Sequence, residues 1–403
     1  MNRKISTPSL FLLIVLIGFP QISETIYSPI LPDLASAMRA SDNTIQLTFG
    51  IYFLGFALGV FSWGRLSDFI GRRPALLWGI FVYAIGCIAC YLSDSAYWLL
   101  LSRFVQAFGA SAGSVVTQTI IRECMEGSKR QAAFATISAA LAFSPAMGPL
   151  IGGWMDQVFG YGAVFLVLIG MSVAIFAYAY SSLPETKVSA AAIISLSSVS
   201  KRLVKDKRVW AFGLLIGTTN GILFSYYAEA PFLFIEFYHL TPGTFGFLGI
   251  FVALASMLGA LLSRKLSVRF SAEKLIVTGA LITTLGAMLL MGCSYVAVSS
   301  SLLSLAFIVL SVFTLLAGIG LMIPNCLSVA LVAYSDVLGT AGAMFGLGYY
   351  AVVSLITSGM SLLHNDSLLV MPVYFLLLAL MMTAVSMILL SLNKVKPGTA
   401  PSA

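Results

Sequence analysis

Charged residues are scarce in this chain. Only 9% of its 403 residues are Asp, Glu, Lys or Arg, whereas 59% are hydrophobic and the mean hydropathy is +0.99. A soluble domain keeps roughly a quarter of its residues charged, so a single water-exposed globule is excluded. Apolar surface on this scale must face lipid, where only helices and closed barrels satisfy the backbone. The apolar runs are continuous and do not alternate at period two, which indicates helices.

Histidine is also scarce. The only two histidines are His239 and His364, and both are predicted to lie in loops on the outer face. They cannot form an intramembrane metalloprotease or a Ser–His nucleophile, and the patterns of ATP-binding loops, zinc fingers and dinucleotide sites are missing. The sequence therefore predicts no enzyme, no metal site and no cofactor. No basic cluster is interleaved with stacking aromatics, which excludes nucleic acid as a partner.

Cysteines number five, and two of them are spaced like a redox pair. Cys87 and Cys90 lie inside an apolar run, however, where free cysteine usually behaves as a small buried residue. We therefore expect both to serve packing and to carry no redox chemistry.

About twelve apolar segments are long enough to span a bilayer, which takes about 20 residues. The first is expected to stay in place as a span, because no small-residue cleavage site follows it. The sequence predicts an all-α polytopic membrane protein. The predicted spans are 9–32, 46–64, 74–93, 96–121, 131–154, 159–182, 209–236, 243–263, 273–297, 300–333, 339–363 and 368–392.

Basic residues gather on one side of these spans. With the N-terminus inside, only Arg39 of the 22 basic residues falls on the outer side and only Arg103 falls within a span. Cytoplasmic loops carry such an excess of Lys and Arg. The sequence thus predicts a multi-pass protein of the bacterial inner (cytoplasmic) membrane with both termini in the cytoplasm.

One long hydrophilic segment divides the spans into two sets of six. A faint repeat between residues 64–79 and 263–279 supports the division. Parallel repeats of this kind bind substrate between them, near the middle of the membrane. The predicted organisation is a six-helix half at 1–183, a cytoplasmic central loop at 184–208, a second six-helix half at 209–393 and a cytoplasmic tail at 394–403.

The string from Gly64 to Pro74 joins the second and third spans and reads as a tight turn with several ionised groups. An ordinary positive loop is the plain alternative. The string resembles the signature loop of the major facilitator superfamily at every defining position. That resemblance implies conformational gating by locking the outward-facing state, with Asp68 and Arg72 as the principal residues. The predicted gating residues in this loop are Gly64, Asp68, Gly71, Arg72 and Arg73.

Two further strings support the same resemblance. Residues 103–107 resemble the fourth-span motif, with Ala107 where glycine is usual. Residues 148–153 resemble the end of a fifth-span motif associated with antiporters, although its upstream glycines are replaced. An ordinary helix kink is the alternative for this second string. The predicted gating residues here are Pro145, Gly148, Pro149, Gly152 and Gly153.

Within that superfamily the chain is most similar to the Bcr/CflA group of twelve-span drug:proton antiporters, notably at residues 27–32, 52–59, 231–236 and 339–341. The resemblance implies the major facilitator fold, with two pseudo-symmetric six-helix halves. It also implies proton-coupled efflux of small molecules, drugs or metabolites, by alternating access in a monomer. A proton-coupled importer of a nutrient or siderophore on the same fold remains the alternative, because direction leaves little trace in sequence.

Three ionisable residues fall within spans, where each costs roughly 2.5–3.5 kcal/mol and indicates function. At about 1.5 Å per residue, Glu24, Arg103 and Glu229 lie roughly 10–12 Å below the outer surface. The family resemblance implies that the spans carrying these residues line a central cavity. Our hypothesis is that Glu24 carries the proton, Arg103 modulates it and Glu229 contributes to recognition of substrate or cation. The group's usual acid aligns with Thr25, and a shift of one residue rotates a helical side chain by about 100°. The Glu24 side chain could therefore point away from the cavity. Glu24 and Glu229 could also be buried groups that neighbouring side chains satisfy.

Aromatic and amide side chains within the spans are candidates for lining a substrate cavity. Contact with lipid or with another helix is the alternative for each. The predicted cavity residues are Tyr27, Asn220, Tyr227, Asn325 and Tyr349.

Overall fold

The computed structural model describes residues 8–125, 127–141, 143–187, 196–296, 302–365 and 367–394, and the regular elements of this part are all helices. Residues 188–195 of the predicted central loop and all of the predicted tail except Lys394 lie outside the described residues.

The chain crosses the bundle in two sets of helices. The first set is α1 (Leu10–Thr25), η1 (Ser28–Ile30), α2 (Leu31–Ala37), α3 (Asp42–Ile70), α4 (Arg72–Tyr91), α5 (Ala96–Cys124), α6 (Gly127–Leu141), α7 (Ser144–Phe159) and α8 (Gly162–Ser182). After α9 (Leu196–Lys205), the second set is α10 (Lys207–Pro231), η2 (Phe232–Phe237), α11 (Pro242–Leu266), α12 (Ala272–Val296), α13 (Leu302–Ala330), η3 (Val332–Val337), α14 (Leu338–Leu363) and α15 (Val370–Lys394).

Eleven helices of the described part are long and apolar enough to cross a membrane. The predicted fifth span, 131–154, is formed by two shorter helices, α6 and α7. Pro145 lies in the first turn of α7, where its missing N–H is tolerated, so a new helix begins there. The chain is an all-α, multi-pass membrane protein, as the sequence predicts.

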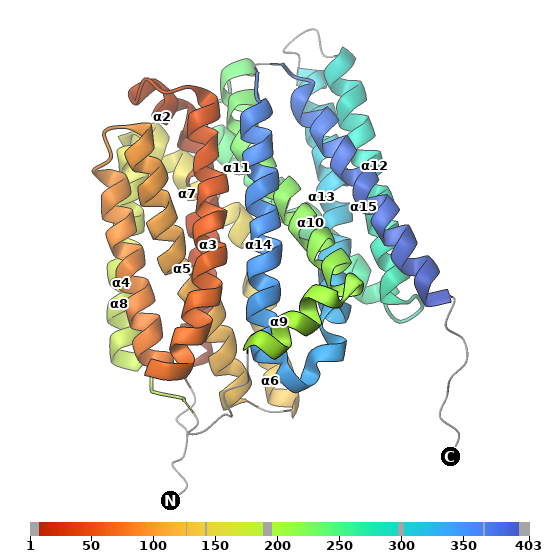
Figure 1. Ribbon diagram of the computed structural model, residues 1–403. Helices are drawn as coiled ribbons and strands as arrows, with labels where there is room; N and C mark the ends of the chain where they lie inside the picture. Colours follow the sequence, from red (N-terminus) through yellow and green to blue (C-terminus); the bar gives the residue numbers. More distant parts are fainter. Residues whose placement is uncertain are drawn as a thin grey trace, which may run out of the picture.

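The helices pack side by side in one bundle, with α9 crossing one end and α2 lying at the other (Figure 1). We call the end with α9 the proximal end and the end with α2 the distal end. Residues that lie far apart in the sequence therefore meet at the same level of the bundle.

The two halves repeat one packing pattern. In the first half α3 and α4 pack on α5, and in the second half α11 and α12 pack on α13. The pair α4–α8 is matched by α12–α15. Between the halves, α7 packs on α11 and α3 packs along α14, and the second of these pairs runs down the middle of Figure 1. This is the predicted pair of pseudo-symmetric six-helix halves.

Each half begins with a span whose distal part is irregular. The first gives way at Ile26–Tyr27 to η1, which contains Pro29, and the second continues beyond Pro231 as the π-helical η2. Proline has no N–H for the helical ladder, and π-turns are frequent at functional sites. Glu24 and Glu229 each lie just before one of these breaks.

The predicted tight turn over residues 64–74 is shorter in the structure. Helix α3 continues through Ile70, and the chain turns only at Gly71, whose φ of 103° suits glycine. The expectation that the whole string forms a turn was wrong, because its charged residues complete the last turns of a helix that extends past the apolar span.

The hydrophilic segment contains a helix that the sequence analysis did not predict. Val199 and Leu203 of α9 are buried, on the side of α9 that packs on α14 and α10, whereas Lys201 and Lys205 are exposed. Apolar residues four apart form one helix face. The basic residues around this short face hid it from a reading based on hydropathy.

The contact between α1 and α7 depends on glycine. A Cβ at Gly148 would overlap the Thr25 side chain, and one at Gly152 would overlap the backbone oxygen of Ile26. Small residues let helix backbones approach in membranes. The predicted gating string therefore forms a tight contact exactly where the first span breaks.

Gly152→Ala is expected to destabilise the protein by about 1–3 kcal/mol, the usual penalty for overpacking, because a backbone oxygen cannot move aside on its own. Thermal unfolding in detergent micelles measures this. Gly170→Ala in α8 is the matched control, since its added methyl group meets nothing within 4 Å. Equal unfolding midpoints for the two variants would contradict the role of this contact.

Candidate functional site

A cavity of about 200 Å³ lies between the two halves. Helices α1, α3, α5, α7, α10 and α14 contribute its walls. Glu24 is the only carboxylate among the lining residues, and just 7% of its surface is exposed. The other polar and aromatic lining residues are Gln21, Thr25, Phe56, Ser114, Asn220, Phe224, Tyr227 and Tyr350.

Two of the five predicted cavity residues line this cavity, namely Asn220 and Tyr227. The Tyr227 hydroxyl donates to the Pro145 carbonyl at 2.9 Å, which ties α10 to α7 across the two halves. The Asn220 amide donates to the Ile216 carbonyl one turn earlier at 2.9 Å. Its other polar atom, the amide oxygen, is the one suited to accept a hydrogen bond from a solute.

The other three predicted cavity residues lie elsewhere. Asn325 donates to Ser263 Oγ at 2.7 Å and so joins α13 to α11. The Tyr349 ring packs on Tyr350, with 4.4 Å between ring centroids, and it is Tyr350 that lines the cavity. Tyr27 is fully buried inside the first half.

Arg103 is fully buried between two aromatic rings. Its guanidinium carbon lies 4.2 Å from the Tyr27 ring centroid and 4.3 Å from that of Tyr52. Nη1 donates to Gln106 Oε1 at 2.6 Å, while Nε and Nη2 have no hydrogen-bond partner in the described part of the chain. Arg103 is close enough for its charge to act on the Glu24 carboxyl, so the structure brings these two predicted residues together.

The five cysteines are free. Gln106 Nε2 donates to Cys87 Sγ at 3.2 Å, and Cys90 Sγ lies 3.9 Å from Gln106 Oε1. Cys87 and Cys90 are both buried. They surround the amide that holds Arg103, which agrees with a packing role.

Glu229 lies towards the distal end and is not among the residues that line the central cavity. It is 7% exposed, accepts from Gln46 Nε2 at 2.9 Å, and lies 2.9 Å from Nδ1 of His364. A second cavity of about 250 Å³ borders Glu229, His364 and Glu236. The predicted layer of three charges therefore divides into a Glu24–Arg103 pair and a separate distal group.

The signature loop forms a charge network at the proximal end. Arg72 Nη1 donates to Asp68 Oδ1 at 2.7 Å, and Arg72 Nε donates to Glu123 Oε2 at 3.0 Å. Glu185 accepts from the Arg72 backbone N–H at 2.9 Å. The Arg73 guanidinium donates to a carbonyl of α8, that of Tyr180, at 2.7 Å. Helices α3, α4, α5 and α8 are thus joined through one arginine-rich turn.

Several residues at these sites were missed by sequence reasoning. Glu123 and Glu185 lie far from the signature string. His364 was expected in an outer loop and does follow the end of α14, but its burial, at 8% exposed, was not foreseen. Gln46 was passed over because it is the first residue of the predicted span 46–64, where a polar side chain is ordinary. Glu123 and Glu185 could have been identified as partners of the signature loop, because each is a charged residue at the end of a predicted span.

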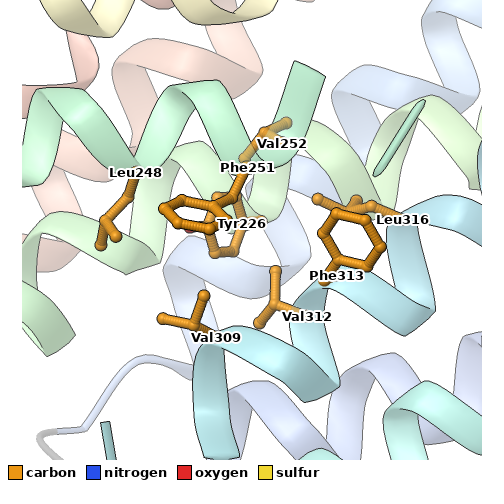
Figure 2. Close-up of a pocket in the computed structure, with 8 residues that line it drawn as sticks. All are labelled: Tyr226, Leu248, Phe251, Val252, Val309, Val312, Phe313 and Leu316. Carbon is orange, nitrogen blue, oxygen red and sulfur yellow. The ribbon is translucent and has the colours of Figure 1, made fainter. Parts of the chain in front are cut away.

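An apolar crevice in the second half is too small to be an alternative binding site to the central cavity. Figure 2 shows Tyr226 of α10 beside Leu248, Phe251 and Val252 of α11, with four side chains of α13 opposite. Its volume is about 10 Å³, which is roughly the space for one water molecule. A solute of drug or metabolite size cannot be held there.

Comparison with known proteins identifies the family. Residues 11–358 match the family model of the Major Facilitator Superfamily. An uncharacterised transporter of Rickettsia bellii is 34% identical over 96% of this chain and 97% of its own, and a chloramphenicol resistance protein of Pseudomonas aeruginosa is 30% identical over 89% and 85%. The solved structure of a POT family transporter, at 14% identity, covers 96% of each chain with a TM-score of 0.77. The chain therefore belongs to the major facilitator superfamily and is a membrane transporter.

Proposed function

We propose that this transporter exports small molecules, drugs or metabolites, from the cytoplasm in exchange for protons. The proximal end faces the cytoplasm in this proposal, and the protein lies in the bacterial inner membrane as a monomer. The observation that carries it is Glu24, a single buried carboxyl in the wall of a cavity between the two halves. The family relationship supplies alternating access.

A carboxyl in this place is suited to exchange. Its cavity is walled by the rings of Phe56, Phe224, Tyr227 and Tyr350, which favour a solute with an aromatic or apolar body. Glu24 provides the one ionisable contact and can hold a proton or interact with the solute. When the cavity opens alternately to the two sides of the membrane, Glu24 can release a proton on one side and interact with the solute on the other. One carboxyl group can thus exchange proton for solute.

Three further observations support the proposal. The arginine network at the proximal end coincides with the predicted cytoplasmic excess of basic residues. The Tyr227–Pro145 hydrogen bond links α7, the helix that carries the antiporter-like string at residues 148–153, to the cavity wall. A relative at 30% identity is a chloramphenicol resistance protein, which favours efflux over import.

The test uses inverted membrane vesicles from an efflux-deficient host, acidified inside by respiration. Adding chloramphenicol, other phenicols, sulfonamides or cationic dyes is expected to raise the lumenal pH as protons leave in exchange. Vesicles without the protein give the background. An importer that co-transports protons would show the signal only when the solute is loaded inside, and that result would overturn the proposed direction.

A further inference from the structure

The first turns of α3 reach across to the second half at the distal end. Gln46 Nε2 donates to Glu229 Oε2 at 2.9 Å, and Asp42 Oδ2 lies 3.8 Å from His364 Nε2. Positions 42 and 46 lie four residues apart, on the same face of a helix. Both contacts therefore join one face of α3 to α10 and to the end of α14.

Asn43 adds a third link of a different kind. Its Nδ2 donates to the backbone carbonyls of Ser361 and His364, both at 2.8 Å. The last four carbonyls of a helix lack partners within that helix. Asn43 thus caps the C-terminal end of α14 from the opposite half of the protein.

His364 is the centre of the group. Its Nδ1 lies 2.9 Å from each oxygen of Glu229, which belongs to the same half. Burial lowers the pKa of His364, but the hydrogen bonds and charges of Asp42 and Glu229 outweigh it and raise that pKa to about 10. At neutral pH the ring is an imidazolium with a carboxylate at each of its two nitrogens.

These contacts differ in whether they can persist when the two halves move relative to one another. The Glu229–His364 pair lies within the second half and can persist. The contacts made by Asp42, Asn43 and Gln46 cross between the halves, so they must break when the distal end opens. We propose that Asp42, Asn43 and Gln46 form with Glu229 and His364 a latch that holds the distal end closed and releases once in each transport cycle.

The surroundings suit a contact that opens and closes. The distal cavity of about 250 Å³ borders Glu229 and His364 from the second half, so water can solvate both groups as α3 withdraws. When the α3 contacts are lost, the charged groups of Glu229 and His364 are then hydrated by water and are not left unpaired in an apolar interior.

Distance measurements between spin labels test the latch directly. Labels at Ala37→Cys and Ser367→Cys, both exposed distal positions on opposite halves, report opening of the protein in lipid nanodiscs. The partly buried Cys124 and Cys293 are changed to serine, and the three buried cysteines remain. We expect a dominant short distance in the parent protein. Asn43→Ala and His364→Gln are each expected to raise the ratio of long to short distances about tenfold. For Asn43→Ala this corresponds to two hydrogen bonds to neutral carbonyls, and for His364→Gln to the loss of contacts with charged groups.

His239→Asn is the matched control. His239 is the other histidine, is exposed near the distal end, and has a φ of 56° that asparagine tolerates. Asn43→Ala leaves every charge in place, so its distance distribution still tests the latch if His364→Gln does not fold. Unchanged distances in Asn43→Ala, or an equal shift in His239→Asn, would overturn the latch.

The pH dependence provides a second readout. The charged groups facing His364 are Asp42 from α3, Glu229 from α10 and Glu236 of η2 in the adjoining cavity. Because the raised pKa keeps the ring protonated, the latch should be equally closed at about pH 6 and about pH 8. It should open as the pH rises through about 10. Loss of this alkaline transition in His364→Gln supports the assignment, and its persistence there would contradict it.

Discussion

Glu24→Gln is expected to reduce substrate-triggered proton release by about two orders of magnitude, the scale on which a positioned proton-transfer group acts. Glutamine has nearly the same shape as glutamate, so the cavity wall should remain intact. Its amide cannot take up and release a proton in the working pH range. Lumenal pH in inverted vesicles measures the loss.

The control for this change is Asp94→Asn, which neutralises an exposed carboxylate between α4 and α5. It should leave proton release unchanged. Binding of the solute to purified Glu24→Gln separates loss of coupling from loss of the site. Full proton release in Glu24→Gln would remove Glu24 from the mechanism and leave Glu229 as the next candidate.

Arg103→Met is expected to impair coupled transport strongly without weakening the fold, because it removes the charge that acts on the Glu24 carboxyl. Burying a charge costs several kcal/mol, and the two tyrosine contacts offset about 2 kcal/mol each. Since Nε and Nη2 have no partner in the described residues, an apolar side chain of similar length should be tolerated. The thermal unfolding midpoint should stay within about 2 °C of the parent protein or rise above it. Gln106 would keep its contact with Cys87.

Arg103→Lys is the companion variant. It keeps the positive charge near Glu24 but loses the planar group held between Tyr27 and Tyr52. We expect it to retain part of the transport activity that Arg103→Met loses. Parent-like transport by Arg103→Met would show that the residue serves packing alone, and an unfolded Arg103→Met would show that the fold depends on the charge.

The fold was predictable because its signals are long and repeated. Apolar runs mark the spans, and the distribution of Lys and Arg predicts the orientation. The signature string indicated the family from local residues. It could not show that Arg72 meets Glu123, because that carboxylate comes from another span and only three-dimensional packing brings the two together.

The site was only partly predictable. Helical rise placed Glu24, Arg103 and Glu229 at one depth, but depth does not determine direction. The one-residue displacement of Glu24 counted against it, because a rotation of about 100° could turn its side chain out of the cavity. Glu24 and Thr25 both lie in α1 and both line the cavity, so the wall is wide enough to include the two positions. The partners of Glu229 come from two other spans, and nothing in the local sequence identifies them.

The distal cavity has a pharmacological consequence. Its lining combines Glu229 and Glu236 with His364 and the aromatic side chains Phe232 and Phe237. The two carboxyl groups outnumber the single imidazolium, and such a setting attracts a compact aromatic cation. A compound wedged there in the proposed orientation would act from the periplasm without crossing the inner membrane. Bound beside Glu229 and His364, it would act on the latch while leaving the central cavity free. Such inhibition would be noncompetitive, so no excess of the exported solute would relieve it.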